Sequence, residues 1–187
     1  MVDVYFAFLA LLALERIGEL VLSRRNAAWA IAQGGREEGR AHYRVMTAFH
    51  TAFLLSCALE PWLLSRPFPR PWGWVALGVA VSAQALRYWA IATLGHRWNT
   101  RVIVLPDAAP VTGGPYRFIK HPNYVAVGVE LAAVPLIHGA WLTSLVFSLG
   151  NLALLRVRIK VEEAALGPKW KAAFEGKGRF VPGAGRG

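Results

Sequence analysis

This sequence has a single cysteine, and its histidines lack the spacing of metal ligands. Its one cysteine, Cys57, lies inside an apolar run, which excludes an intramolecular disulfide framework and a thiolate metal site and predicts a small core residue. The five histidines show neither an HxxxH nor an HExxH spacing, and no carboxylate cluster accompanies them at ligand intervals. No metal site is therefore expected.

Charged residues are also scarce. They make up 17% of the 187 residues, whereas 55% are hydrophobic, and the formal net charge is +10. This composition is typical of membrane proteins, and the length allows one domain, residues 1–187. The lysines and arginines lie between long apolar runs and are not spread among polar residues, so they indicate membrane topology and not nucleic-acid binding.

Five apolar segments approach the roughly 20 residues that a helix needs to cross a bilayer. No internal repeat is visible, and the first segment lacks the basic flank and cleavage site of a signal peptide, so we expect it to be retained. The fourth and fifth are separated only by His138, Gly139 and Ala140, which predicts a tight helical hairpin. The fold class expected is an all-α, polytopic membrane protein with spans at Val4–Leu22, Val45–Leu64, Trp72–Leu94, Pro122–Ile137 and Trp141–Ile159.

The basic residues are distributed asymmetrically around these spans. Of the 21 lysines and arginines, 17 fall in the connections after spans one and three or at the end of span five, against Arg66 and Arg70 on the other side. The positive-inside rule then places the N-terminus outside and the C-terminus in the cytosol.

Several polar residues interrupt the spans and are candidates for function because ionisable groups are costly in hydrocarbon. The alternative for Arg16 is a structural ion pair with Glu15 or Glu19, and for Arg87 an ion pair with some acid. The full set is Glu15, Arg16, Glu19, Glu60, Gln84, Arg87, Glu130 and Asn151. Glu60 precedes a proline near the interface and could simply be solvated; His50 is expected to be a hydrogen-bonded packing residue.

The segment "GPYRFIKHPNYVAVGVE", residues 114–130, carries unusual polar chemistry at a helix entrance. The residue before proline avoids the helical region, and proline fits the first helical turn, so a helix should begin at Pro122. The N–H groups of Asn123 and Tyr124 would then be free to bind an anion, beside Arg117, Lys120 and His121. The alternative is an ordinary basic loop followed by a proline-capped helix.

The segment "NLALLRVRIKVEEAAL", residues 151–166, carries two arginines and two acids. At 100° per residue, Asn151, Leu155, Arg158 and Glu162 share one helical face, which favours Glu162 as the partner of Arg158. The alternative is a solvated charge run. Because both segments fall on the cytosolic side, one hairpin apart, they predict a polar pocket between spans four and five that opens towards lipid.

These two motifs resemble the isoprenylcysteine carboxyl methyltransferase family of integral membrane methyltransferases. The resemblance is carried by "VTGGPYRFIKHPNYVAVG", "RVRIKVEEAAL" and the aromatic tail, and it covers Leu94 to Pro182, the expected cofactor and catalytic half, about 94–182. Upstream, "ERIGELVLSRRNAAW" and "LRYWAIATLGHRWNTRVIVLP" are similar to a bacterial branch resembling alkylpyrone and alkylresorcinol O-methyltransferases.

The resemblance implies S-adenosylmethionine as methyl donor and a lipophilic substrate that enters from the bilayer of a bacterial plasma membrane. It places Gly114, Tyr116, Lys120, His121, Pro122, Asn123 and Tyr124 in the cofactor site. It assigns catalysis to Arg158 and Glu163, whereas the helical face of Arg158 selects Glu162 as its partner. A break in the helix would reconcile the two assignments. Of the two acids, Glu163 is ranked first as the partner of Arg158.

Two departures from the family pattern matter. Lys120 stands where the family has arginine, which keeps the charge but loses the bidentate fork. Glu130 stands where the eukaryotic enzymes carry an apolar residue, which argues against a prenylcysteine substrate. Glu130 could act as a base towards a ring hydroxyl, or it could be a buried partner of Arg87 or Gln84.

The expected function is therefore O-methylation of an alkylpyrone or phenolic lipid. The alternatives are an isoprenylcysteine-type carboxyl methyltransferase, a phospholipid N-methyltransferase, an NADPH-dependent membrane reductase and a non-enzymatic membrane scaffold. No G-x-G-x-x-G motif is present, but such reductases do not require one. The oligomeric state is not predicted.

Overall fold

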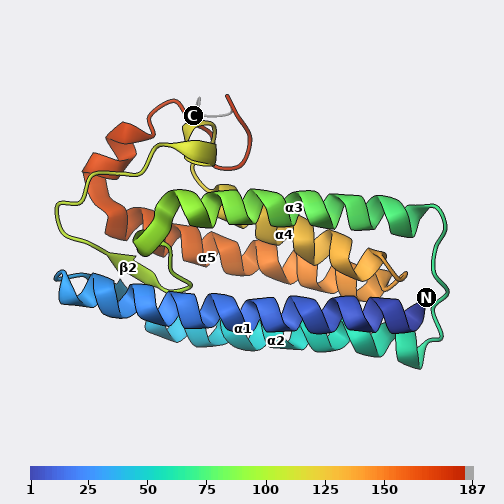
Figure 1. The fold of residues 1–187 in the computed structure, drawn as a ribbon. Helices are drawn as coiled ribbons and strands as arrows, with labels where there is room; N and C mark the ends of the chain where they lie inside the picture. Colours follow the sequence, from blue (N-terminus) through green and yellow to red (C-terminus); the bar gives the residue numbers. More distant parts are fainter. Residues whose placement is uncertain (184–187) are drawn as a thin grey trace.

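The structure is a computed structural model that describes residues 1–183, and in this part of the chain five α-helices form the molecule (Figure 1). They run alongside one another, with two short 3₁₀ turns and one pair of short strands in the connections. The helices are α1 (Val2–Ala32), α2 (Arg40–Leu63), α3 (Trp72–Leu94), α4 (Pro122–Leu136) and α5 (Trp141–Ala173). The turns are η1 (Gly95–Arg97) and η2 (Gly114–Arg117), and the strands are β1 (Arg36–Glu38) and β2 (Val102–Val104).

Three predicted helix starts, at Trp72, Pro122 and Trp141, and the predicted hairpin are confirmed, whereas α1 and α2 begin earlier than predicted. The helix α4 begins at Pro122, after His121, whose φ of −129° and ψ of 61° lie outside the helical region that a following proline disfavours. The α4–α5 connection turns at Gly139, which has a φ of +73°. A Cβ there would also approach the carbonyl oxygen of Pro67 to 3.3 Å, so glycine suits the turn on both counts.

The helix α5 is much longer than the span predicted from its hydropathy. Its 33 residues measure about 50 Å, while the hydrocarbon layer is about 30 Å thick, so the part after Ile159 extends beyond it. The backbone leaves the helical region at Gly167, with φ 72° and ψ −167°, immediately before Pro168. The helix is therefore continuous through Arg158 and both acids and breaks four residues after Glu163.

A two-stranded antiparallel pair was not predicted. β1 and β2 pair in the register Arg36↔Val104, Glu37↔Ile103 and Glu38↔Val102. Three-residue strands give no usable alternation in sequence, and "REE" has low β-propensity. The pair ties the α1–α2 connection to the α3–α4 connection at the end of the bundle where α1 ends (Figure 1).

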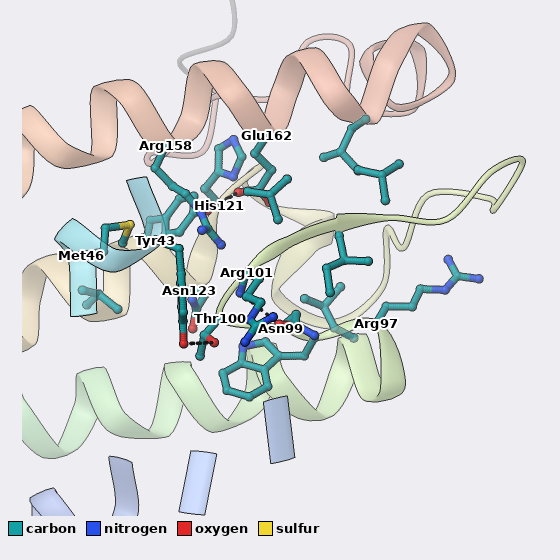
Figure 2. A pocket seen from close by; sticks show the side chains of 18 of the residues that line it. Tyr43, Met46, Arg97, Asn99, Thr100, Arg101, His121, Asn123, Arg158 and Glu162 are labelled. Carbon is teal, nitrogen blue, oxygen red and sulfur yellow. Dashed lines mark hydrogen bonds and ion pairs between the residues drawn. The ribbon is translucent and has the colours of Figure 1, made fainter. Parts of the chain in front are cut away.

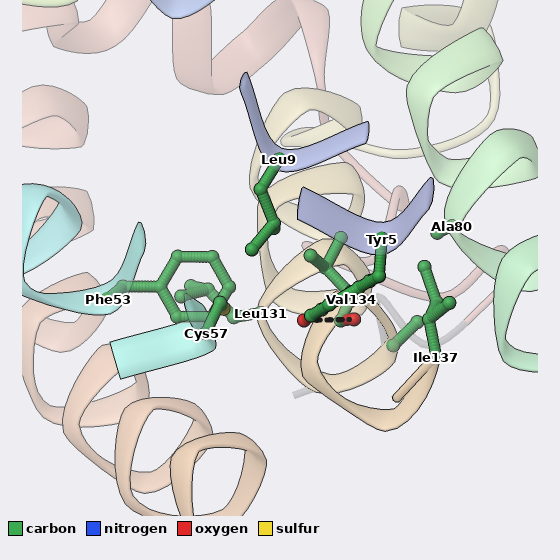
Figure 3. Packing of buried hydrophobic residues seen from close by; sticks show 9 residues of the cluster. Tyr5, Leu9, Phe53, Cys57, Ala80, Leu131, Val134 and Ile137 are labelled. Carbon is green, nitrogen blue, oxygen red and sulfur yellow. Dashed lines mark hydrogen bonds between the residues drawn. The ribbon is translucent and has the colours of Figure 1, made fainter. Parts of the chain in front are cut away.

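The apolar core lies between α1, α2, α3 and α4 at the opposite end of the bundle (Figure 3). Cys57 is completely buried there, as predicted, among Tyr5, Phe53 and Leu131. The Tyr5 hydroxyl donates to the carbonyl oxygen of Val134 at 3.2 Å, so a polar atom in this core has its partner. Large apolar side chains such as Leu11, Val79, Leu145 and Leu152 point outwards, as lipid contact requires.

Glu60, which the sequence suggested could be solvated, is buried. Its carboxylate accepts hydrogen bonds from the backbone N–H of Thr143 at 2.7 Å and from that residue's hydroxyl at 2.8 Å. It also accepts from the N–H of Leu142 at 3.3 Å and pairs with Arg66 at 3.5 Å. The N-terminus of α5 has orphan N–H groups and a positive dipole end, so a carboxylate is stabilised there.

Two of the helices are long and apolar enough to cross a membrane by composition alone, Trp72–Arg97 and Trp141–Ala173. The α1 and α2 sequences carry charges that lower their mean hydropathy, and the 15 residues of α4 measure only about 22 Å. The all-α class and the membrane character thus stand, while the five-span topology stays a prediction. Arg186, one of the basic residues in the topology count, lies outside the described residues.

Candidate active site

One cavity of about 630 Å³ connects the loop end of the bundle with the middle of the helices (Figure 2). Its outer part is lined by the loop from Trp98 to Val111 and by the break in α5. Its middle is lined by α4 and α5, and its inner part by α1, α2 and α3. The predicted pocket between α4 and α5 is therefore present, and it is deeper than the sequence indicated.

The first residues of α4 form an aromatic and polar wall of this cavity. The His121 ring stacks on Tyr124 with a centroid distance of 5.2 Å and contacts Trp170 at 5.6 Å. Trp170 in turn packs on Phe174 at 4.8 Å, which brings the part of α5 after its break against the start of α4. Lys120 lies over the Trp170 ring at 5.9 Å.

Arg158 lies at the centre of the cavity wall, buried, with its Nε donating to the Tyr124 hydroxyl at 3.0 Å. The Tyr124 hydroxyl donates to a Glu162 carboxylate oxygen, and Glu162 pairs with Arg158 at 3.9 Å. Asn151, Leu155 and Arg158 are all buried, which confirms the predicted face of α5. The pairing of Arg158 with Glu162, derived from helical spacing, is also confirmed.

Glu163, ranked first as the partner of Arg158, has different neighbours. Its carboxylate contacts His121 Nε2 at 3.0 Å and accepts two hydrogen bonds from the Arg179 guanidinium, at 2.9 and 2.7 Å. It does not line the cavity within the described residues. The ranking was wrong because α5 has no break between the two acids, so Glu163 stays one residue, about 100°, away from the Arg158 face.

The Arg179 guanidinium, helped by His121, lowers the pKa of Glu163 from its ordinary 4.5 to about 2, although partial burial opposes the shift. Glu163 is therefore ionised at neutral pH and holds His121 in place. Nearby, burial raises the pKa of Tyr116 above its usual value, so this phenol stays neutral.

Five of the seven predicted cofactor residues line the cavity: Tyr116, Lys120, His121, Asn123 and Tyr124. Gly114 and Pro122 do not, and they shape the backbone instead. Gly114 has a φ of +52°, and a Cβ there would lie 2.3 Å from the Thr93 hydroxyl oxygen, so only glycine fits.

The predicted anion site of free N–H groups is only partly available. The Tyr124 N–H donates to the His121 carbonyl oxygen at 3.1 Å and is therefore used. The N–H groups of Lys120 and His121 donate to the carbonyl oxygens of Gly178 and Arg179, at 3.0 and 3.1 Å. The segment after α5 thus closes the helix mouth from one side, a contact that no local sequence pattern reveals.

The loop after η1 contributes cavity residues that the site prediction missed. Ser23 of α1 fixes this loop, because its hydroxyl donates to the Asn99 side-chain oxygen at 2.8 Å and accepts from the Thr100 N–H at 3.0 Å. Arg101 lies over the Tyr43 ring at 5.3 Å and pairs with Glu37 at 3.5 Å. The polar string "HRWNTR" between two apolar segments was the available signal.

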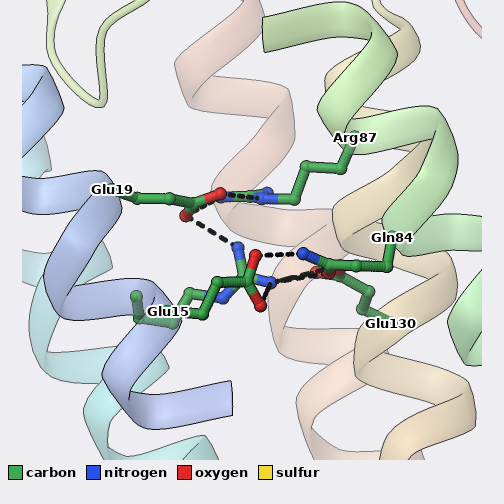
Figure 4. Close-up of polar contacts among 6 residues, drawn as sticks. Glu15, Glu19, Gln84, Arg87 and Glu130 are labelled. Atoms are coloured by element: carbon green, nitrogen blue, oxygen red, sulfur yellow. Dashed lines mark hydrogen bonds and ion pairs between the residues drawn. The ribbon is translucent and has the colours of Figure 1, made fainter. Parts of the chain in front are cut away.

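Glu130 lies in a buried ionic cluster at the inner end of the cavity (Figure 4). Its carboxylate pairs with Arg16 of α1 at 3.2 Å, and Arg16 also pairs with Glu19 at 2.8 Å. Arg87 of α3 donates twice to Glu19, with both distances 2.6 Å. The predicted ion pairs of Arg16 and Arg87 are thus confirmed, whereas the direct partner of Glu130 is Arg16 and not Arg87 or Gln84.

Comparison with known proteins identifies the family of this chain. The model of the isoprenylcysteine carboxyl methyltransferase (ICMT) family matches residues 75–168, which contain the His-Pro segment, Arg158 and both acids. The chain belongs to the ICMT family. The uncharacterized protein YpbQ of Bacillus subtilis is 37% identical over 162 residues, 87% of this chain and 96% of that protein. An uncharacterized protein of Haemophilus influenzae is 27% identical over 167 residues, 89% of this chain and 96% of the relative.

Methyltransferases of the ICMT family use S-adenosylmethionine, and the described cavity has groups that suit it. The donor carries a cationic sulfonium, an ammonium, a carboxylate and an adenine ring. The Glu162 carboxylate suits the cations, Lys120 suits the carboxylate, and the His121 and Trp170 rings suit the adenine. The side-chain oxygen of Asn123 is buried without a hydrogen-bond partner in residues 1–183, which leaves an acceptor for a ligand N–H or O–H.

Proposed function

We propose that this ICMT-family protein is an S-adenosylmethionine-dependent O-methyltransferase whose acceptor is the hydroxyl of an alkylpyrone or phenolic lipid. The observation that supports this most strongly is the buried Arg158, fixed by Tyr124 and Glu162, in one cavity with the His-Pro segment. A buried guanidinium fixed on two sides is suited to an oxyanion, which is the form in which a phenol or enol attacks a methyl group.

The protein's own residues would align the reactants and stabilise charge. When bound, S-adenosylmethionine supplies a methyl group already activated on sulfur, so alignment in a dry site is the main requirement. Arg158 holds the acceptor oxygen, and Glu162 and Tyr124 keep the guanidinium oriented. His121, fixed by Glu163, forms part of the donor site together with Tyr116, Lys120 and Asn123.

Glu130 is the proposed acceptor of the hydroxyl proton. The cluster around it contains three carboxylates (Glu15, Glu19 and Glu130) and two guanidiniums (Arg16 and Arg87), a formal charge of −1 when all are ionised. One proton would therefore neutralise the cluster, in a place where net charge is costly. A carboxylate acceptor is already ionised, so it brings no proton for Glu130 to accept.

The same cluster, together with Arg158, weighs against the alternative methyl acceptors. A prenylcysteine would place hydrocarbon against ionised groups, which would leave them desolvated without new hydrogen bonds. A phospholipid amine would bring a nitrogen nucleophile beside the Arg158 cation, which does not favour a cationic product.

The proposed setting is a bacterial plasma membrane with five spans. The outer part of the cavity faces the cytosol, where the soluble donor is available, and the basic residues support this orientation.

Turnover with a defined acceptor tests the proposal. Protein in liposomes is given tritiated S-adenosylmethionine with an alkylpyrone. A separate sample receives NADPH in place of the methyl donor, which tests the reductase alternative. The proposal expects tritium in the pyrone and a fall of about 100-fold or more in Arg158→Ala, because a fixed oxyanion partner is lost. Arg156→Ala, an exposed arginine two residues earlier on the same helix, is the matched control and should keep its activity. Full activity of Arg158→Ala, in protein that melts like the wild type, would sink the assignment.

A further inference from the structure

The inner end of the cavity has hydrogen-bonding capacity that the proposed methyl transfer does not use. Arg87 is 7% exposed and lines the cavity, and its Nη1 has no hydrogen-bond partner in the described part of the chain. His50 lines the same region, and its Nδ1 lies 2.8 Å from the carbonyl oxygen of Met46. A carbonyl only accepts, so Nδ1 carries the proton and Nε2 of the neutral ring is left as an acceptor.

The charge of this region determines what kind of group it can bind. Arg87 is already neutralised by two hydrogen bonds to Glu19, and the cluster as a whole has a formal charge of −1. An additional anion would be repelled. A neutral hydroxyl or carbonyl, in contrast, would give the orphan Arg87 donor an acceptor without adding charge.

Arg158 and the inner region line one continuous cavity. A single acceptor can therefore contact both, with one oxygen at Arg158 and a second oxygen at Arg87 and His50.

We propose that the region around Arg87 and His50 is a second polar subsite that binds a neutral oxygen of the acceptor, while Arg158 binds the oxygen that is methylated. This inference rests on the proposed function and specifies its substrate class, a lipophilic ring that carries two oxygens. Leu54, Val127 and Leu131 line the cavity around the subsite and provide apolar contacts for the ring.

Two acceptors that differ only in the second oxygen test the subsite. A 5-alkylresorcinol and the 3-alkylphenol with the same alkyl chain are compared for kcat/KM with S-adenosylmethionine. The wild type should prefer the two-oxygen ring by about tenfold or more, the effect of one hydrogen bond to a charged group. Arg87→Lys keeps the charge opposite Glu19 but loses the fork, and His50→Phe keeps the ring but loses its nitrogens. Both variants should lose most of this preference.

Leu54→Ala is the matched control, because it removes an apolar contact at the same depth and should lower kcat/KM for both acceptors alike. A wild-type preference of about twofold, the statistical factor for two equivalent hydroxyls, would overturn the subsite. So would an unchanged preference in both polar variants. No methylation of either phenol or of the alkylpyrone would instead contradict the proposed function, and the substrate class would fall with it.

Discussion

At the scale of single residues, the two adjacent acids of α5 have separate partners. Glu162 contacts Arg158 and Tyr124 at the cavity wall, whereas Glu163 contacts His121 and Arg179 behind it. Helical spacing was enough to assign Glu162, since Arg158 and Glu162 are four residues apart on a continuous helix. The partner of Glu163 could not be predicted, because Arg179 returns to the site only through a backbone turn with no sequence signature.

Glutamine variants of the two acids should therefore differ in kinetics. Glu162→Gln should lower kcat by about 10–100-fold, because Arg158 loses the carboxylate that orients it. Glu163→Gln should mainly raise KM for S-adenosylmethionine, since it loosens His121 at the donor site. Steady-state kinetics with both substrates varied separates the effects. Equal losses of kcat in both variants would contradict the division of roles.

Glu163 should also contribute to the acid stability of the protein. Its pKa is about 2 in the folded state and near 4.5 when unpaired, so its stabilising effect is fully present above about pH 4.5 and is lost as the pH falls towards 2. Melting of detergent-solubilised wild type and Glu163→Gln over this range tests the point. The difference in Tm should be constant from pH 7 to about pH 5 and shrink below it; a difference that grows on acidification would exclude the assigned shift.

At the scale of elements, apolar length and proline position were enough to predict five helices, and the starts of α3, α4 and α5 were predicted to the residue. The extensions of α1 and α5 were missed because they leave the apolar runs and continue as charged helix. The paired strands, the loop fixed by Ser23 and the burial of Glu60 were missed because each depends on a partner far along the chain.

Glu60 should stabilise the α2–α5 contact without affecting catalysis. Glu60→Ala leaves the N–H groups of Leu142 and Thr143 without their acceptor and should destabilise the protein by about 2–3 kcal/mol. Unfolding in mixed micelles gives the free energy, and the exposed Leu59→Ala on the same helix is the control. A large loss of kcat in folded Glu60→Ala would show that this end of the bundle takes part in the reaction.

At the scale of the whole molecule, charge placement and bundle geometry support one orientation. The start of α1 lies at the end of the bundle where α2 and α3 are joined, and the extended part of α5 lies at the other end with the outer part of the cavity. An odd number of spans would place these two ends on opposite sides of the membrane. The cavity would then open to the cytosol and reach inwards to the ionic cluster at mid-depth.

Thiol labelling tests this topology with little background, because Cys57 is completely buried. Cysteine is introduced at the exposed Gln33 or Arg70, which lie at opposite ends of the bundle. A membrane-impermeant reagent should label Arg70→Cys on intact cells and Gln33→Cys only after permeabilisation. The reverse pattern would contradict the orientation, and labelling of both on intact cells would contradict a membrane crossing by α2, the helix between the two positions.

The most direct test of the central claim is to identify the methylated product. The protein in liposomes is incubated with isotopically labelled S-adenosylmethionine and a lipid extract of the host, and the products are analysed by mass spectrometry. The account predicts a labelled lipophilic ring compound that carries the new methyl group on oxygen, and none in Arg158→Ala. Label found only on a phospholipid amine or on a carboxyl group, or no labelled lipid at all, would contradict it.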